Sequence, residues 1–232
     1  MSPRNRQDNE EIREKRREQI LDAAMSVYID QGYNGSDVDQ VAETAGLAKG
    51  LIYYYFKTKQ ELFRAMFDWA LDHLMDINNN LMVMDSTVSD PFEKFLLYIV
   101  RVFNLAESDL RTIRFAMRLP FDAFTIFGSK EWKKGMERSS VFMSSMAMFI
   151  SNMVKSGIIP EVDAFFAANS FWAVFVMNFF NINRMIGAGK NKDTASIKDN
   201  GKLKKVITFC FLGLGINRKV LEKYLNKIKE KA

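Results

Sequence analysis

The sequence predicts an all-α protein, and three features point to that class. Apolar residues recur at three- and four-residue spacing through most of the chain. No segment shows the two-residue alternation of a half-buried strand. Several of the 12 Gly and 4 Pro stand where helical segments end, and the 48% of hydrophobic residues among 232 can fill a sizeable core.

Two helices are expected at the front of the chain. The first covers about 13–30, and Gly32 follows it in a place that suits a left-handed cap. The second begins at Ser36, whose spacing to Asp39 is that of a capping box, and it ends at Gly46. Its inner face consists of Val38, Val41, Ala42 and Ala45.

A third helix is expected over about 48–56, and a fourth begins at Thr58, with Glu61 completing a second capping box. A break over 85–91 separates these helices from the rest of the chain. The remaining helices are predicted to begin at Pro91 and then to cover about 109–118, 130–155, 162–186, 202–214 and 217–230.

Short helices joined by a tight turn at Gly46 describe a helix-turn-helix. The small residues there allow the second and third helices to cross closely, which leaves Lys49, Leu51 and Tyr54 pointing outwards. A helix of this kind lies in the DNA major groove and presents its first residues to base edges. From residue 46 to 60 the chain has three lysines and no acid, and the start of the fourth helix, with Thr58 and Lys59, favours a phosphate.

The same stretch resembles the N-terminal domain of TetR (tetracycline-repressor-like) transcription regulators. The resemblance runs over about 12–74 and includes ILDAA at 20–24, GY at 32–33, VDQVAETAGLAKGLIYYYF at 38–56 and KTKQEL at 57–62. It implies a DNA-binding domain over 12–74, with the helix-turn-helix at about 37–56 and a shared fourth helix from 59. It also implies an effector-binding and dimerisation domain over 75–232, and a homodimer that reads a palindromic operator. The helices 162–186 and 202–214 are the expected dimer pair.

Together, geometry and resemblance predict a set of DNA-contacting residues. Tyr55 and Lys59 are expected to bind phosphate, whereas Phe56 is expected in the core. Two positions depart from the family pattern: Asp37 follows Ser36 where a Thr-Thr pair is common, and Ala48 replaces a Ser or Thr hydroxyl. The predicted DNA contacts are Ser36, Lys49, Gly50, Leu51, Tyr54, Tyr55, Thr58 and Lys59.

The rear helices predict an apolar effector pocket, a dimer core, or both. From Ser139 to Asn183 the only charged residues are Lys155, Glu161 and Asp163, so these helices must bury most of their surface. A small lipophilic effector would suit such surroundings, although each side chain is also compatible with ordinary core packing. The predicted pocket residues are Phe103, Phe115, Met117, Phe121, Phe124, Met143, Met146, Phe171, Trp172, Phe175, Asn178 and Phe179.

Other classes of protein have little support in the sequence. The chain has one cysteine, Cys210, and one histidine, His73, and it contains no phosphate-binding loop or hydrolase motif. We therefore expect a cytoplasmic, non-enzymatic regulator without cofactor, metal or signal peptide, most often a repressor. One alternative is an effector-independent DNA-organising protein. The other is a membrane-attached interaction protein that uses the apolar stretch 164–182 and the Lys-rich tail, residues 219–231.

Overall fold

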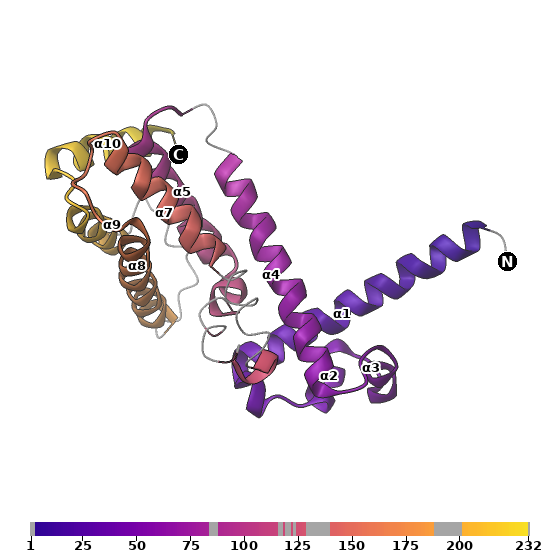
Figure 1. The fold of residues 1–232 in the computed structure, drawn as a ribbon. Helices are drawn as coiled ribbons and strands as arrows, with labels where there is room; N and C mark the ends of the chain where they lie inside the picture. Colours follow the sequence, from indigo (N-terminus) through magenta and orange to yellow (C-terminus); the bar gives the residue numbers. More distant parts are fainter. Residues whose placement is uncertain are drawn as a thin grey trace. The chain divides into compact units, whose positions relative to one another are not determined.

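The structure is a computed structural model that describes residues 3–83, 88–115, 118, 122, 124–128, 140–187 and 201–231. All regular elements in these ranges are helices, so the predicted all-α class is confirmed (Figure 1). The chain divides into two compact units. Unit 1 comprises Met1–Asn78 and Ser108–Ser140, and unit 2 comprises Asn79–Glu107 and Val141–Ala232.

Helix α1 spans Pro3–Gly35, which is longer at both ends than the predicted 13–30. Its first half is rich in Arg, Glu and Gln, which are good helix formers, and Arg17 pairs with Glu14 at 3.2 Å one turn away. Residues 9–15 are exposed, and this part of α1 extends past α2 and α3 in Figure 1. Gly32 has a positive φ of 72°, but its ψ of 175° is extended, so it interrupts α1 without forming the left-handed cap that was expected there.

The turn that follows α1 corrects one predicted cap. Helix α2, Val38–Ala45, is capped by Asp37, which accepts from the Asp39 amide, and Gln40 closes the box on the Asp37 amide at 2.9 Å. The predicted Ser36–Asp39 box is therefore wrong by one residue. Ser36 faces inwards, where its hydroxyl donates to the Gly32 carbonyl at 2.5 Å. Asp37, which departs from the family pattern, thus has a structural role.

Helix α3, Lys49–Tyr55, follows Gly46, which ends α2 with φ 65°. Its N-cap, Ala48, makes no side-chain capping bond. Helix α4, Lys59–Val83, begins as predicted, because Thr58 Oγ1 accepts from the Glu61 amide at 3.0 Å. In return, the Glu61 carboxylate accepts a hydrogen bond from the Lys57 amide at 2.7 Å, one residue before the cap.

A later segment of the chain also belongs to unit 1. Residues 110–115 are helical, and the Phe115 ring packs edge-on against Tyr28 and Phe67. Arg111 Nη2 lies 2.6 Å from Asp22 Oδ1, and Arg118 Nη1 donates to the Ile29 carbonyl at 2.9 Å. The predicted boundary at 74–75 places this segment in the second domain, whereas its contacts place it in unit 1 with α1 and α4.

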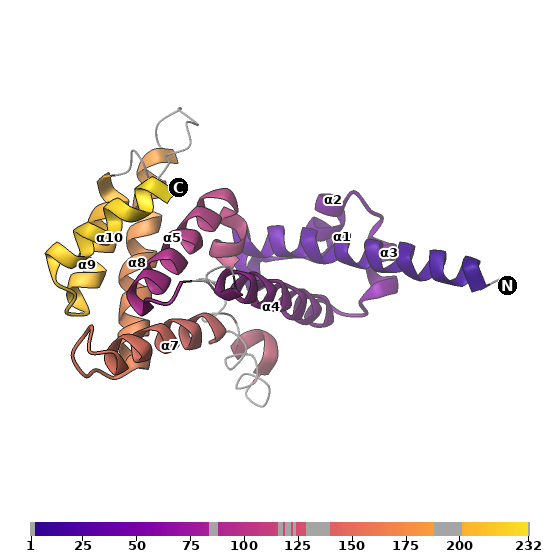
Figure 2. The ribbon, with the colours of Figure 1, turned by 90° about the horizontal axis from the view of Figure 1, so that it is seen from above.

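Unit 2 contains α5 (Pro91–Ser108), α7 (Val141–Lys155), α8 (Ala164–Gly187), α9 (Gly201–Gly213) and α10 (Arg218–Lys231). Helix α9 packs against both α8 and α10, as Figures 1 and 2 show. The core contains a cluster of aromatic rings: Phe92, Phe95, Phe149, Phe171 and Phe211. Within the described ranges, no helix is both long enough and apolar enough to cross a membrane.

The last helix is fixed to the start of α5 by polar contacts. Tyr224 donates its hydroxyl to Asp90 Oδ2 at 2.6 Å, and Lys227 Nζ lies 2.6 Å from Glu93 Oε2. Glu93 is only 5% exposed, and a buried carboxylate needs a partner of opposite charge. Lys227 supplies that charge while its side chain remains 47% exposed. Residues of the predicted Lys-rich tail thus bind residues at the start of α5 within unit 2.

Candidate nucleic-acid interface

Helix α3 has one buried side and one exposed side. Ile52 and the Phe56 ring are buried, in agreement with the predicted core role of Phe56. Tyr54 lies on the opposite side and is 63% exposed, and Tyr53 is 39% exposed. Because a seven-residue helix has only two turns, this division leaves its N-terminal end and the Tyr54 side free for a partner.

Lys49 begins α3 and forms an ion pair that the sequence analysis missed. Its ammonium lies 2.7 Å from Asp39 Oδ1, a residue of α2. The hydrogen bond to Asp39 raises the pKa of Lys49 above its ordinary value. Ten residues separate the two partners, and no local spacing rule connects them.

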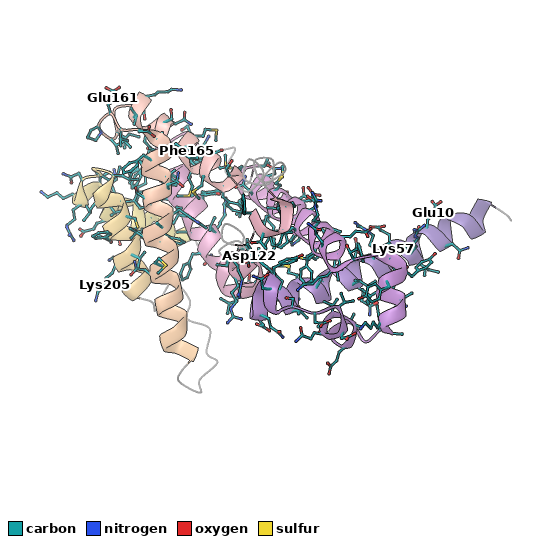
Figure 3. All side chains as sticks on the ribbon, turned by 60° about the horizontal axis from the view of Figure 1, so that its bottom comes forward. Glu10, Lys57, Asp122, Glu161, Phe165 and Lys205 are labelled. Carbon is teal, nitrogen blue, oxygen red and sulfur yellow. The ribbon has the colours of Figure 1, made fainter. Side chains whose placement is uncertain are left out.

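Lys57, which is labelled in Figure 3, also makes hydrogen bonds within unit 1. Its ammonium lies 3.3 Å from the Tyr53 carbonyl and 3.4 Å from the Tyr54 carbonyl, at the C-terminal end of α3. A cation is stabilised there because the last carbonyls of a helix carry partial negative charge. Tyr54 and Tyr55 meet edge to face at 5.3 Å, with Lys57 6.0 Å from the Tyr54 ring centre.

Thr58 and Lys59, the two residues expected to bind phosphate at the start of α4, already make contacts inside unit 1. Thr58 Oγ1 caps the helix, and the Lys59 ammonium stands 4.8 Å from the centre of the Tyr33 ring. Ser36 is 4% exposed, and its hydroxyl bonds inside unit 1, so its surroundings do not favour a phosphate contact. Gly50 is exposed, while Leu51 and Tyr55 are half-buried. DNA contact by all eight residues stays a prediction.

Contacts from α1 hold the helix-turn-helix in place. Gln19 Nε2 donates to the Ala45 carbonyl at 2.7 Å, at the last turn of α2. The Arg17 guanidinium stands 5.9 Å from the centre of the Phe56 ring. The end of α2 and the end of α3 are therefore each anchored to the same helix, which fixes the side of α3 that faces outwards.

The predicted effector residues fall into both units. Phe115 and Phe124 belong to unit 1, where Phe115 is buried and Phe124 is 58% exposed. Met117 and Phe121, with the side chain of Phe179, lie outside the described residues. The described members in unit 2 are Phe103, Met143, Met146, Phe171, Trp172, Phe175 and Asn178.

Most of the unit 2 members pack tightly. The Phe175 ring meets Phe103 edge to face. The rings of Phe171 and Trp172 are each stacked against Phe175. Asn178 is exposed and its amide donates to the Val174 carbonyl at 2.8 Å, so it finds its partner within α8. The predicted pocket made by these side chains stays a prediction.

Unit 2 does contain a sizeable cavity, and Phe171 is the one predicted pocket residue among its described lining residues. It has a volume of about 440 Å³ and lies between α8, α9 and the segment before α8. Its walls include Phe166, Phe171, Phe209 and Leu214, together with Val162. Phe166 and Phe209, which line it, are more than half exposed, and Figure 3 marks Glu161, another lining residue, before the start of α8.

One helical unit with a helix-turn-helix at α2 and α3, together with a second helical unit, defines the class of two-domain helix-turn-helix proteins. Residues 20–66 match the family described as "Bacterial regulatory proteins, tetR family". The HTH-type transcriptional activator FasR of Mycolicibacterium smegmatis is 30% identical over 110 residues, 47% of this chain and 49% of that protein. The fatty acid metabolism regulator protein of Bacillus subtilis is 33% identical over 91 residues, 39% of this chain and 45% of that protein.

The fold extends the likeness beyond the front domain. The transcriptional regulator FadR from Bacillus subtilis, solved in complex with stearoyl-CoA, superposes with a TM-score of 0.57 at 21% identity. The match covers 82% of this chain and 97% of that structure. Residues 20–66 therefore match the N-terminal domain of the tetR family, and the chain as a whole is similar to these regulators in fold. It spans about half the length of the curated relatives that it matches.

Proposed function

We propose that this chain is a cytoplasmic homodimeric repressor that binds a palindromic operator and is released by a largely apolar effector. The exposed side of α3 carries the proposal: Lys49 and Tyr54 face outwards while Ile52 and Phe56 hold the helix to the domain. In a dimer, two such helices would enter successive major grooves about 34–36 Å apart. The predicted contacts Gly50, Leu51, Tyr55, Thr58 and Lys59 complete this interface, with Ser36 the least supported.

The proposed dimer uses α8 and α9. Both helices expose large apolar side chains on one side, among them Phe166 and Phe209, at 69% and 66% exposure. Exposed rings of this number are unusual on a monomer surface, and an identical second copy would cover them. Sedimentation equilibrium of the full chain should give twice the monomer mass of 26.8 kDa.

For the effector we propose a ligand with a long apolar acyl chain, and the specific candidate is a long-chain acyl-CoA, whose coenzyme A part is polar and anionic. The relative in Bacillus subtilis is named a fatty acid metabolism regulator, and the structural neighbour FadR is described in complex with stearoyl-CoA. Helices α7 and α8 offer an apolar environment in which a long acyl chain loses contact with water. An effector of this kind would act by binding the operator-free conformation more tightly than the operator-bound one.

The test begins with selection of duplexes from a random pool by gel shift. The selected operator is then titrated with the protein in the presence of stearoyl-CoA, with free coenzyme A as the matched control that lacks the acyl chain. Release of DNA by stearoyl-CoA alone would support the proposal. Failure to select any preferred sequence would refute it, and release by neither ligand would refute the effector class.

An effector-independent DNA-organising protein is the second candidate. The close ring packing between Phe103 and Phe175 and among Phe171 and its neighbours favours it, since those side chains already fill the space that an effector would need. In the same titration, this candidate predicts operator binding that no member of a panel of lipophilic compounds alters.

A further inference from the structure

The Asp39–Lys49 ion pair lies on the surface that the proposed function assigns to DNA. The Lys49 ammonium is 2.7 Å from Asp39 Oδ1 and 2.8 Å from Oδ2. The two side chains are 52% and 58% exposed, for the lysine and the aspartate respectively. An ion pair this exposed contributes little to folding stability, so its position at the outer edge of the helix-turn-helix calls for another role.

Local structure holds the backbone of both partners in place. The Asp39 amide donates to Asp37 Oδ1 at 2.9 Å in the cap of α2, while Lys49 is the first residue of α3, three residues after the left-handed Gly46. A lysine side chain alone is flexible and would sample many directions. Bonding to the carboxylate restricts the ammonium to one place on the surface between the two helices.

The pair matches the major-groove edge of a G·C base pair. Guanine presents the acceptors O6 and N7, and cytosine presents the N4 amino donor. Guanine O6 and cytosine N4 are joined by a base-pairing hydrogen bond, so they lie about 2.9 Å apart. An ammonium and a carboxylate oxygen 2.7 Å apart therefore offer a donor and an acceptor at nearly the same spacing.

From this match we infer that Asp39 and Lys49 together read one G·C base pair in each half of the operator. Lys49 donates to guanine O6 and N7, and Asp39 accepts from cytosine N4. The inference rests on the proposed function, because it names the base pair that the same surface recognises. The inference also gives a reason for an acid on this surface. The Asp39 carboxylate repels DNA phosphates, so the Lys49 ammonium contacts a base instead of a phosphate.

The competing explanation is that Asp39 only neutralises Lys49. The two explanations predict opposite changes in operator affinity when Asp39 is removed. If Asp39 only neutralises, its removal frees a cation and strengthens binding to every duplex equally. If Asp39 reads cytosine, its removal weakens binding to the operator relative to a scrambled duplex.

The experiment compares four proteins on the selected operator by fluorescence anisotropy: wild type, Asp39→Ala, Lys49→Ala and Glu43→Ala. Glu43 is the matched control, since it is another exposed acid of α2 and is not part of the pair. Each G·C position is tested in turn with a cytosine analogue that lacks the N4 amino group. Thermal melting of each variant establishes that it is folded.

At one G·C position per half-site, we expect the analogue to weaken wild-type binding by about tenfold, the scale of one good base contact. Asp39→Ala should lose a similar factor on the natural operator and show no further loss with the analogue, because the two changes remove the same contact. Glu43→Ala should keep the wild-type response. Lys49→Ala should lose discrimination against 7-deazaguanine at the paired guanine.

Two results would overturn the inference while leaving the proposed function intact. One is an Asp39→Ala protein that binds operator and scrambled duplex more tightly by the same factor. The other is an Asp39→Ala protein that still loses affinity with the analogue at every position where wild type does. If wild type itself shows no sequence preference, the proposed function fails and the inference fails with it.

Discussion

Gly32 stands near the end of α1 with φ 72°, and a Cβ placed on it would come within 2.5 Å of Arg118 Nη2. The ψ of 175° at Gly32 completes a backbone conformation that essentially only glycine adopts, so a residue with a Cβ is strained there by about 1–3 kcal/mol. Arg118 would move aside, because the obstructing atom is the end of a flexible side chain, and it would lose its bond to the Ile29 carbonyl. With a discount for solvent exposure, that bond contributes about 1 kcal/mol.

We therefore predict that Gly32→Ala destabilises the protein by about 2–4 kcal/mol. Two other glycines of unit 1 serve as controls. Gly46 has φ 65° and nothing within 4 Å of an added Cβ, so Gly46→Ala should cost only the strain, about 1–2 kcal/mol. Gly50 lies in open space inside α3 without a positive φ, so Gly50→Ala should be neutral or stabilising by up to about 1 kcal/mol.

Urea unfolding followed by helical circular dichroism measures this series. With a slope of about 1–3 kcal/mol per molar urea, Gly32→Ala should lower the midpoint by on the order of 1 M. In an Arg118→Ala background, Gly32→Ala should cost about 1 kcal/mol less than in the wild type, because the bond that it displaces is already gone. Equal stability of Gly32→Ala and wild type, or an unchanged cost in that background, would refute the reasoning.

Three further predictions concern other contacts. Hydrogen bonding to Asp90 raises the pKa of Tyr224 to about 12, so the stability that Tyr224→Phe removes should be constant below pH 10.0 and vanish as pH rises through about 12. A difference that persists above that range in urea titrations would contradict this. Lys59→Ala should weaken operator and scrambled duplexes alike and lower the salt slope by about 1, whereas Lys49→Ala should reduce sequence preference; anisotropy over a salt series distinguishes them. Phe209→Asp should shift the protein towards monomer in sedimentation, and an unchanged dimer would exclude Phe209 from the interface.

The front of the chain shows how far local patterns extend. The helix breaks at Gly32 and Gly46 and the Thr58 cap could be predicted, because each depends on residues within one turn. The cap of α2 was misplaced by one residue because Ser36 and Asp37 are both good N-cap residues. The bond from Ser36 to the Gly32 carbonyl turns its side chain inwards, and that choice depends on the kink before it.

The candidate site shows where local patterns end. The outward direction of Lys49 and Tyr54 followed from the phase of α3, and burial of Ile52 and Phe56 agrees with it. The Asp39–Lys49 pair could not be predicted, since it joins two helices whose crossing is set by packing.

The sequence by itself determined the class of fold, the helix-turn-helix and the residues on each side of its third helix, because helical phase, caps and small residues act over one or two turns. Only the tertiary structure decided which partners the charged side chains take and where residues 108–128 belong. Arg111 meets Asp22 and Arg118 meets Ile29 across 89 positions of the chain. Such contacts form only when packing brings distant helices together, and no pattern within either segment encodes the other.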